Sequence, residues 1–424
     1  MTATLHTLAN GVRVIADPMP SLESAALTVV TGAGARYEDP GTNGWSHLRE
    51  HRVFKGAGAR SSRAIVEAIE QEGGWINAAT GYERTSFQVR HLAGGLPLAM
   101  SVLADLLRRP TLDPAELERE KGVIAQEIAE AADTPDDQVF EMAQTAAFAD
   151  QPLGRPILGS DATLAPVDVA ALEGWRAALY GNPSRLVISA AGAVDEAALL
   201  KAAETAFGDL EAPAAALAPP SLGRFTGGDV AEARKLEQAH LVMLLPGVGV
   251  RDPRWAVQRL FAEVLGGGMA SRLFQEARES RGLCYAVDAY AESYSDTGML
   301  GVYAGTSAKD AKPMAQLAAA ELLKLAQSVE PAELSRAKAQ ARSGLFMSRE
   351  PPLSRAEQNA GQAILFDRLI EPSELAAAVD AVTAEDFATY GRSLVQAGAA
   401  ATAVLGPKTA GSAGRVFSET LAKG

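Results

Sequence analysis

The chain contains little cysteine, little histidine and no long apolar run. Cys284 is its one cysteine among 424 residues, so an intrachain disulfide cannot form and a disulfide-stabilised scaffold is excluded. No uninterrupted apolar stretch is long enough to cross a bilayer, and the N-terminal residues lack the basic start and apolar run of a signal peptide. These absences predict a cytoplasmic protein that does not act at a membrane.

The chain also has fewer basic residues than acidic ones, 39 against 52. The formal net charge is −13, whereas a nucleic-acid-binding surface needs clustered Lys and Arg, so a nucleic-acid partner is not expected. Hydrophobic residues make up 47% of the chain and charged residues 21%, as is typical of globular proteins. A chain of this length exceeds what one hydrophobic core usually organises, which predicts at least two domains.

The order of elements predicted for the first half recurs in the second. Residues 25–40 read as a β-branched strand, a Gly-rich turn and an Asp-Pro pair, and residues 241–253 repeat that order. Residues 167–192 and 382–406 each read as a helix, a strand and a final Gly. Both pairs are separated by roughly 215 positions, a fixed offset that indicates an internal duplication.

A stretch rich in Pro and small residues, 213–224, has the composition of an interdomain linker. It divides the chain into an N-terminal domain, 1–212, and a C-terminal homologous domain, 225–424. Because strands alternate with long Ala/Leu/Glu-rich helices in each half, we expect two similar α+β domains, each a sheet packed with helices.

Two of the five histidines lie in the segment His47-Leu48-Arg49-Glu50-His51. Positions i and i+4 of a helix lie on the same face, so both imidazoles can bind one metal ion, and Glu50 lies near enough to act as a general base. Two neutral imidazoles and a carboxylate suit zinc, which would activate a water for hydrolysis. A chance occurrence of these residues on an exposed helix is the alternative.

A downstream helical segment provides two carboxylates on one face. Glu120 and Glu127 are two helical turns apart, so Glu127 can be the third metal ligand while Glu120 supports a ligand imidazole. The alternative for Glu120 is an ordinary solvated helix face.

These residues resemble the inverzincin (pitrilysin) zinc peptidases, whose H-x-x-E-H motif reverses the usual H-E-x-x-H. Residues 34–38 before the motif, Phe54-Lys55-Gly56 after it, and the spacing from His51 to Glu127 are similar to the processing-peptidase branch of that family. The resemblance covers almost the whole chain. It implies two domains that enclose a cavity, and a protein that works as a homodimer or as a heterodimer with a related subunit.

The resemblance also implies residues that bind substrate. Residues 73–80 are similar to an exposed edge strand, where Asn77 and Ala78 would hold an extended peptide through main-chain bonds. Arg278 and Tyr285 match the spacing of an Arg and a Tyr that reach across the cavity to the substrate backbone. The alternatives are a turn residue for Asn77, and a surface Arg and a packed Tyr in the second half.

The motif departs from the family at Arg49 and Arg52, where large apolar residues are usual. Both point away from the metal on a helical wheel, and a buried unpaired charge is costly. Three explanations are possible: acidic residues surround the two arginines, this face of the helix is more open than in the family, or the domain is less stable.

The function predicted from these residues is a zinc metalloendopeptidase that cleaves short or unfolded peptides, with Glu50 as the general base. The alternative is a non-catalytic partner or scaffold subunit of a dimeric processing-peptidase-like complex. The metal-binding residues favour the enzyme, whereas Arg49 and Arg52 keep the alternative open.

Overall fold

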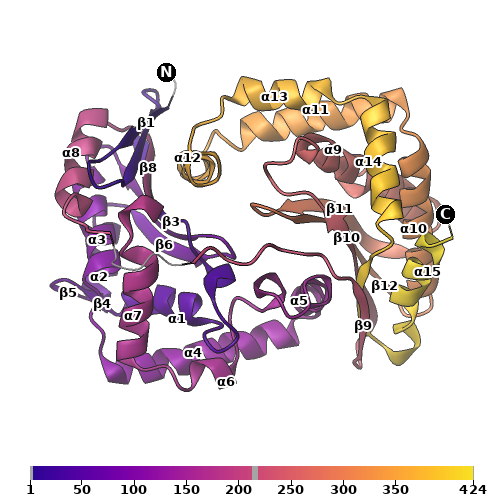
Figure 1. Cartoon of the computed structure of the whole chain (residues 1–424), viewed down its shortest axis with the longest axis horizontal. Coiled ribbons are helices and arrows are strands. Elements are labelled where there is room, and N and C mark those ends of the chain that lie inside the picture. Colours follow the sequence, from indigo (N-terminus) through magenta and orange to yellow (C-terminus); the bar gives the residue numbers. More distant parts are fainter. Residues whose placement is uncertain (1–2, 213–217, 424) are drawn as a thin grey trace. The chain divides into compact units, whose positions relative to one another are not determined.

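The computed structural model describes residues 3–212 and 218–423. The chain forms two compact units, and each unit is assembled from three separate segments (Figure 1). Unit 1 consists of Met1–Ile128, Pro156–Pro220 and Phe346–Ile370, and unit 2 consists of Ala129–Arg155, Ser221–Leu345 and Glu371–Gly424. Each unit combines one main sheet with helices, which confirms the predicted two-domain α+β fold.

Unit 1 is built on a six-stranded sheet in the order β1-β2-β8-β3-β7-β6. The strand bounds are Thr4–Thr7 for β1, Arg13–Pro18 for β2, Ser24–Thr31 for β3, Trp75–Thr80 for β6, Thr85–Leu92 for β7 and Leu186–Gly192 for β8. The pair β2 and β8 is parallel and the other pairs are antiparallel. A hairpin at Asn10-Gly11 joins β1 to β2, and Gly11 adopts a φ of 97° that favours glycine.

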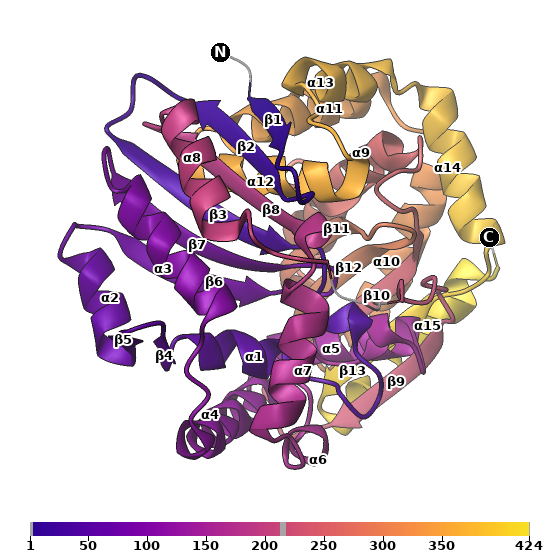
Figure 2. The same cartoon turned by 60° about the vertical axis from the view of Figure 1, so that its left-hand side comes forward.

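Both faces of this sheet are buried, because apolar residues occupy successive positions of its central strands. Val14 and Val29 belong to the cluster beneath α3 (Leu96–Arg108) and α8 (Glu196–Phe207), which lie on one face (Figure 2). Ile15 and Val30, one position along, point to the other face, where α12 (Pro352–Phe366) covers them.

Among the described residues, unit 1 contains five other α-helices. They are α1 (Trp45–Val53), α2 (Ser62–Glu70), α4 (Pro114–Asp133, whose last turn enters unit 2), α6 (Asp161–Leu164) and α7 (Val169–Tyr180). Of these, α1 and α2 contact β6. The small strands β4 (Gly56–Ala57) and β5 (Arg60–Ser61) pair with each other.

Unit 2 repeats the same strand arrangement. Its sheet has the order β11-β12-β10-β13-β9, with one parallel pair at the β9 end and antiparallel pairs elsewhere, which is the pattern of β6-β7-β3-β8-β2 in unit 1. The strand bounds are Gly228–Ala233 for β9, Gln238–Gly247 for β10, Cys284–Ser293 for β11, Gly298–Ser307 for β12 and Ala401–Gly406 for β13. This shared topology supports the duplication inferred from the sequence.

One face of the unit 2 sheet is covered by helices from the second half of the chain. These are α9 (Trp255–Gly266), α10 (Ala311–Gln327), α14 (Ala384–Gln396) and α15 (Ala413–Leu421), with α11 (Pro331–Met347) and α13 (Pro372–Ala381) beside them. The other face is covered by α5 (Pro135–Ala147), which packs against β13 and β10.

The two halves of the chain therefore exchange one helix each. The predicted contiguous domains 1–212 and 225–424 differ from the compact units, because α5 lies in unit 2 and α12 lies in unit 1. The physical reason is that each sheet has a second apolar face, and the helix that buries it comes from the other half. The chain passes between the units at five places, and one of them, at Pro220 and Ser221, lies inside the predicted linker 213–224, of which 213–217 lie outside the described residues.

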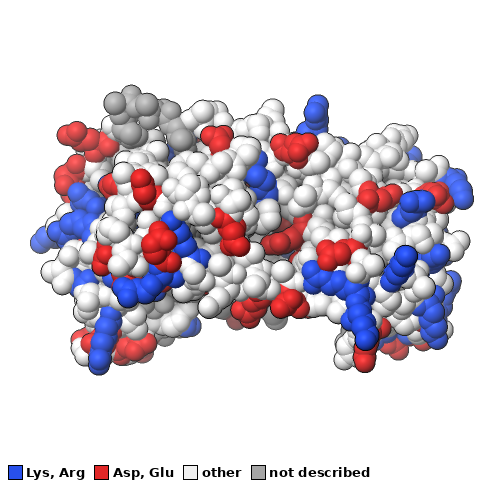
Figure 3. All heavy atoms as spheres, turned by 90° about the horizontal axis from the view of Figure 1, so that it is seen from below, with Lys and Arg blue, Asp and Glu red and all other residues white. Residues whose placement is uncertain are grey.

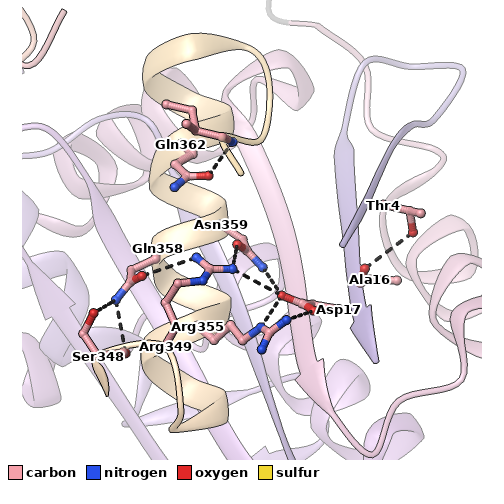
Figure 4. Close-up of polar contacts among 10 residues, drawn as sticks. Thr4, Ala16, Asp17, Ser348, Arg349, Arg355, Gln358, Asn359 and Gln362 are labelled. Carbon is pink, nitrogen blue, oxygen red and sulfur yellow. Dashed lines mark hydrogen bonds and ion pairs between the residues drawn. The ribbon is translucent and has the colours of Figure 1, made fainter. Parts of the chain in front are cut away.

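A buried carboxylate anchors α12 on the unit 1 sheet (Figure 4). Asp17, at the end of β2, has no solvent exposure. The guanidinium of Arg355 donates to both of its oxygens, at 2.6 and 2.8 Å, and Asn359 donates to Oδ2 at 2.7 Å. Arg349 lies 3.7 Å from the same oxygen. This network joins positions that the sequence separates by more than three hundred residues.

Charged side chains of both signs are interspersed on the face drawn in Figure 3, rather than gathered into a continuous basic surface. None of the helices in the described ranges is both long enough and apolar enough to span a bilayer.

Candidate metal centre

The helix that carries the two histidines is fixed at its start by a buried carboxylate. Glu38 accepts hydrogen bonds from the backbone N–H groups of Gly44, at 2.8 Å, and Ser46, at 2.7 Å. A carboxylate in this position accepts hydrogen bonds from N–H groups that have no partner within the helix. Its negative charge also interacts favourably with the positive end of the helix dipole. Gly44 adopts a φ of 89°, and a Cβ there would approach the Leu158 carbonyl oxygen to 2.7 Å, so glycine is required at this turn.

His47 and His51 lie on one face of α1, as their spacing predicts. Their ring centroids are 4.6 Å apart. Burial, with a smaller contribution from the charge of His51, lowers the pKa of His47 to about 4. His47 is therefore neutral near pH 7, which is the form that binds a metal.

Glu127 of α4 brings a carboxylate to both imidazoles. Its Oε2 lies 3.8 Å from Nε2 of His47, and its Oε1 lies 3.6 Å from Nε2 of His51. Ligand atoms about 2.1 Å from a tetrahedral zinc are about 3.4 Å from one another, so these separations are close to those that the ion needs. The residues present fit a zinc ion with a fourth position left open.

A hydrogen-bonded pair orients the ring of His51. Its Nδ1 lies 3.2 Å from Oε2 of Glu120, whose side chain is 3% exposed, and Lys55 donates to Oε1 of Glu120 at 2.7 Å. A proton on Nδ1 leaves the lone pair of Nε2 available to bind a metal ion. Glu120 thus lies in the interior beside a ligand imidazole rather than on a solvated helix face. By contrast, Nδ1 of His47 is buried without a hydrogen-bond partner in the described part of the chain, so packing holds that ring.

Glu50 lies on the same side of α1, beside the end of the edge strand β6. The hydroxyl of Thr80 donates to its Oε2 at 3.0 Å. Burial raises the pKa of Glu50, while the charge of His51 and the hydrogen bond from Thr80 act in the opposite direction. A carboxylate with a raised pKa is better suited to accept and release a proton near neutral pH.

The opposite face of α1 is fully buried, so the more open face considered for Arg49 and Arg52 is excluded. Both side chains are 0% exposed. None of the three guanidinium nitrogens of Arg49 has a hydrogen-bond partner in the described ranges, although its cation lies 5.6 Å from the ring centre of Tyr180. Arg52 donates from Nη2 to the backbone carbonyls of Thr111 and Asp113, at 3.2 and 3.3 Å.

Asn77 and Ala78 lie in β6, at the end of the unit 1 sheet. Ala78 is buried in the core cluster that also contains Val53 of α1, whereas Asn77 is exposed. The sheet pairs β6 with β7 on one side, and the described strands leave its other side unpaired. Asn77 therefore belongs to a strand edge and not to a turn.

Arg278 and Tyr285 lie together in unit 2. Arg278 belongs to a short π-helical segment, Phe274–Ser280, and Tyr285 to β11. The Arg278 guanidinium is 4.7 Å from the ring centre of Phe274 and 5.5 Å from that of Tyr285. Tyr285 is 78% exposed, so it is not the packed tyrosine considered as its alternative.

Three interacting residues escaped the sequence reasoning: Glu38, Lys55 and Thr80. All three stand in segments whose likeness to the peptidase family is visible, but that likeness assigns them no role. Their partners are distant in sequence or depend on how the turns fold, so no local period could identify them. Within the described residues, the His47, His51 and Glu127 group is the one cluster whose geometry could hold a metal.

Comparisons with known proteins find family models and relatives that match most of the chain. The model for insulinase (peptidase family M16) matches residues 13–161, and the model for the peptidase M16 inactive domain matches residues 166–341. An uncharacterized zinc protease of Rickettsia felis is 33% identical over 404 residues, which cover 95% of this chain and 97% of that protein. An uncharacterized zinc protease of Bacillus subtilis is 35% identical over 383 residues, covering 90% of this chain and 92% of that protein.

Solved structures share the fold. A protease from Helicobacter pylori superposes with a TM-score of 0.88 at 17% identity, covering 96% of this chain and 99% of the other. A peptidase M16 inactive domain from Pseudomonas fluorescens gives 0.86 at 19% identity, with the same coverage. With family models on both halves and relatives that match it nearly end to end, the chain belongs to the M16 (pitrilysin) peptidase family.

Proposed function

We propose that this protein is a zinc-dependent endopeptidase that cleaves short or unfolded peptides. The observation that carries the proposal is the convergence of His47, His51 and Glu127, with a half-buried carboxylate, Glu50, on the same helix face. Zinc, when bound, would polarise the scissile carbonyl and lower the pKa of a water molecule. The names of the relatives as zinc proteases support the same assignment.

Glu50 acts as the general base in this proposal. Its carboxylate accepts a proton from the attacking water and passes it to the leaving amine. Burial holds the pKa of Glu50 above its usual range, which makes it a stronger base for the first transfer, from water, than an ordinary exposed carboxylate. Lys55 and Glu120 keep the His51 ring in the orientation that metal binding needs.

The substrate class follows from the edge strand. A peptide that pairs with β6 beside Asn77 and Ala78 must be extended, because main-chain pairing uses alternate N–H and C=O groups along its length. The strand ends at Thr80, which contacts Glu50, so such a peptide would run toward the base. Most main-chain groups of a folded protein are already paired, whereas a short or unfolded chain offers an extended and unpaired main chain. Arg278 and Tyr285 are proposed as further contacts to the peptide backbone.

The experiment combines metal analysis with peptide hydrolysis. We expect about one zinc per chain, which His51→Ala and Glu127→Ala each abolish, and cleavage of a quenched peptide library that stops on addition of a chelator. Glu50→Gln should keep the zinc and lose about a hundredfold or more in rate, because the amide cannot accept the proton. Glu118→Gln, an exposed change on α4, is the matched control. Unchanged turnover of Glu50→Gln would reject Glu50 as the base.

A non-catalytic subunit is the second candidate. The buried guanidinium of Arg49, which has no hydrogen-bond partner among the described residues, favours it, because that charge lies directly behind the proposed metal-binding face of α1. A folded protein that binds no zinc at neutral pH and restores activity to a related chain would select this candidate.

Dimer formation and a cytoplasmic location remain proposals that rest on the resemblance to the processing-peptidase branch and on the sequence. Sedimentation of the purified chain, alone and mixed with a related subunit, distinguishes a homodimer from a heterodimer.

A further inference from the structure

The last residue of the edge strand holds the proposed base. Thr80 ends β6, and its side chain lies on the same face of the strand as that of Ala78, two positions earlier. Ala78 packs into the core cluster that includes Val53 of α1, so this face of β6 is fixed against the metal-binding helix. From there the Thr80 hydroxyl donates to Oε2 of Glu50 at 3.0 Å.

This hydrogen bond selects one of the two carboxylate oxygens. Oε2 accepts from the Thr80 hydroxyl, and the backbone N–H of Thr80 also stabilises the carboxylate, while no side chain of the described residues donates to Oε1. A glutamate side chain has three rotatable bonds, so a carboxylate held at one oxygen loses much of the freedom that would otherwise misplace the other.

We propose that Thr80 is a positioning residue, which orients Glu50 so that Oε1 is the oxygen that accepts the proton during peptide hydrolysis. This inference rests on the proposed endopeptidase function. Because Thr80 also ends the strand on which the peptide would lie, one element sets both the path of the substrate and the orientation of the base.

The role of Thr80 predicts a change in the chemical step rather than in peptide binding. Thr80→Val has nearly the same shape and lacks the donor, so kcat should fall about ten- to a hundredfold, as for loss of a hydrogen bond to a charged group. KM and zinc content should not change, because neither the strand edge nor a metal ligand is altered. Thr80→Ser retains the hydroxyl and should restore most of kcat.

A matched control comes from the neighbouring strand. Thr85 pairs opposite Thr80 in β7, and its hydroxyl donates to the Ala33 carbonyl at 3.2 Å, away from Glu50. Thr85→Val therefore removes a strand hydroxyl without touching the base, and its kcat should equal that of the unaltered protein.

A second measurement does not depend on activity. In crystal structures of the metal-free protein, Glu50 should have one carboxylate orientation in the unaltered chain and in Thr80→Ser, and several in Thr80→Val. Glu50 in the same single orientation in Thr80→Val overturns the proposal, as does an unchanged kcat in that variant. If the unaltered chain binds zinc but cleaves no peptide, the proposed function fails, and the Glu50 orientations still decide the role of Thr80.

Discussion

Replacement of Arg49 by Leu is expected to stabilise the protein, because the fold buries this cation without a hydrogen-bond partner among the described residues. Burial lowers the pKa of Arg49 from its ordinary value to about 10. A pKa lowered by that amount corresponds to about 3 kcal/mol of unfavourable free energy for the charged form. Since the folded pKa of this base lies below the unfolded one, the penalty is fully present at every pH below about 10.

Replacement of Arg52 by an apolar residue should increase the stability less than replacement of Arg49. Arg52→Met removes a buried charge as well, but it also removes the hydrogen bonds to the carbonyls of Thr111 and Asp113, each of which contributes about 1 kcal/mol. For Arg49→Leu, part of the stabilisation is lost because Leu is shorter than Arg and leaves some empty volume. We therefore expect the free energy of unfolding to increase by about 2 kcal/mol. The melting temperature should then rise by about 4–8 °C, and most of the gain in the double variant should come from Arg49.

The assay is calorimetry on zinc-loaded protein, because loss of metal would itself lower the melting temperature. Arg63→Leu is the control, since Arg63 is exposed on α2 and an exposed change usually alters stability by less than about 0.5 kcal/mol. A melting temperature that falls or stays constant in Arg49→Leu, while zinc content is unchanged, would refute the reasoning. It would show that Arg49 is stabilised in the folded protein by interactions that the buried face does not reveal.

Three further predictions test the rest of the site and the fold. Glu120→Ala should weaken zinc binding about 10- to 100-fold, measured by competition with a chelating dye, because the His51 ring loses its acceptor; undiminished affinity would show that Glu120 does not orient the ring. Arg278→Ala and Tyr285→Phe should each lower kcat/KM for peptides at unchanged zinc content, and full activity in both would remove them from substrate binding. Asp17→Ala should cost about 3–5 kcal/mol in denaturant unfolding, because it leaves buried donors of α12 unpaired. The exposed Asp367→Ala should cost at most about 1 kcal/mol, and equal losses in the two variants would contradict the role of the Asp17 network.

The sequence by itself determined the features that depend on local periods. The spacing of His47 and His51 placed two imidazoles on one helix face, and Glu127 followed on a helix that the structure gives as Pro114–Asp133. Helical periods fix which side chains share a face whatever the tertiary context, so the two candidate histidine ligands could be predicted from their spacing, while Glu127 was predicted from its own helix face and from the resemblance to the family. The strand order repeated in both units likewise supports the duplication that the recurring segments indicated.

Only the tertiary structure decided the contacts between segments that are distant in sequence. The exchange of α5 and α12 depends on which sheet face each helix covers. A local sequence pattern can show that a helix has an apolar face, but it cannot predict which sheet that face packs against. In the same way, the Thr80 hydroxyl reaches Glu50, and Lys55 reaches Glu120, because separate strands and helices pack side by side. The sequence flagged Arg49 as unusual, but its complete burial without a hydrogen-bond partner in the described chain is a property of the packed helices around it. The residues proposed to bind the metal could therefore be predicted from the sequence, whereas the residues that hold them in position could be identified only from the packing of distant segments.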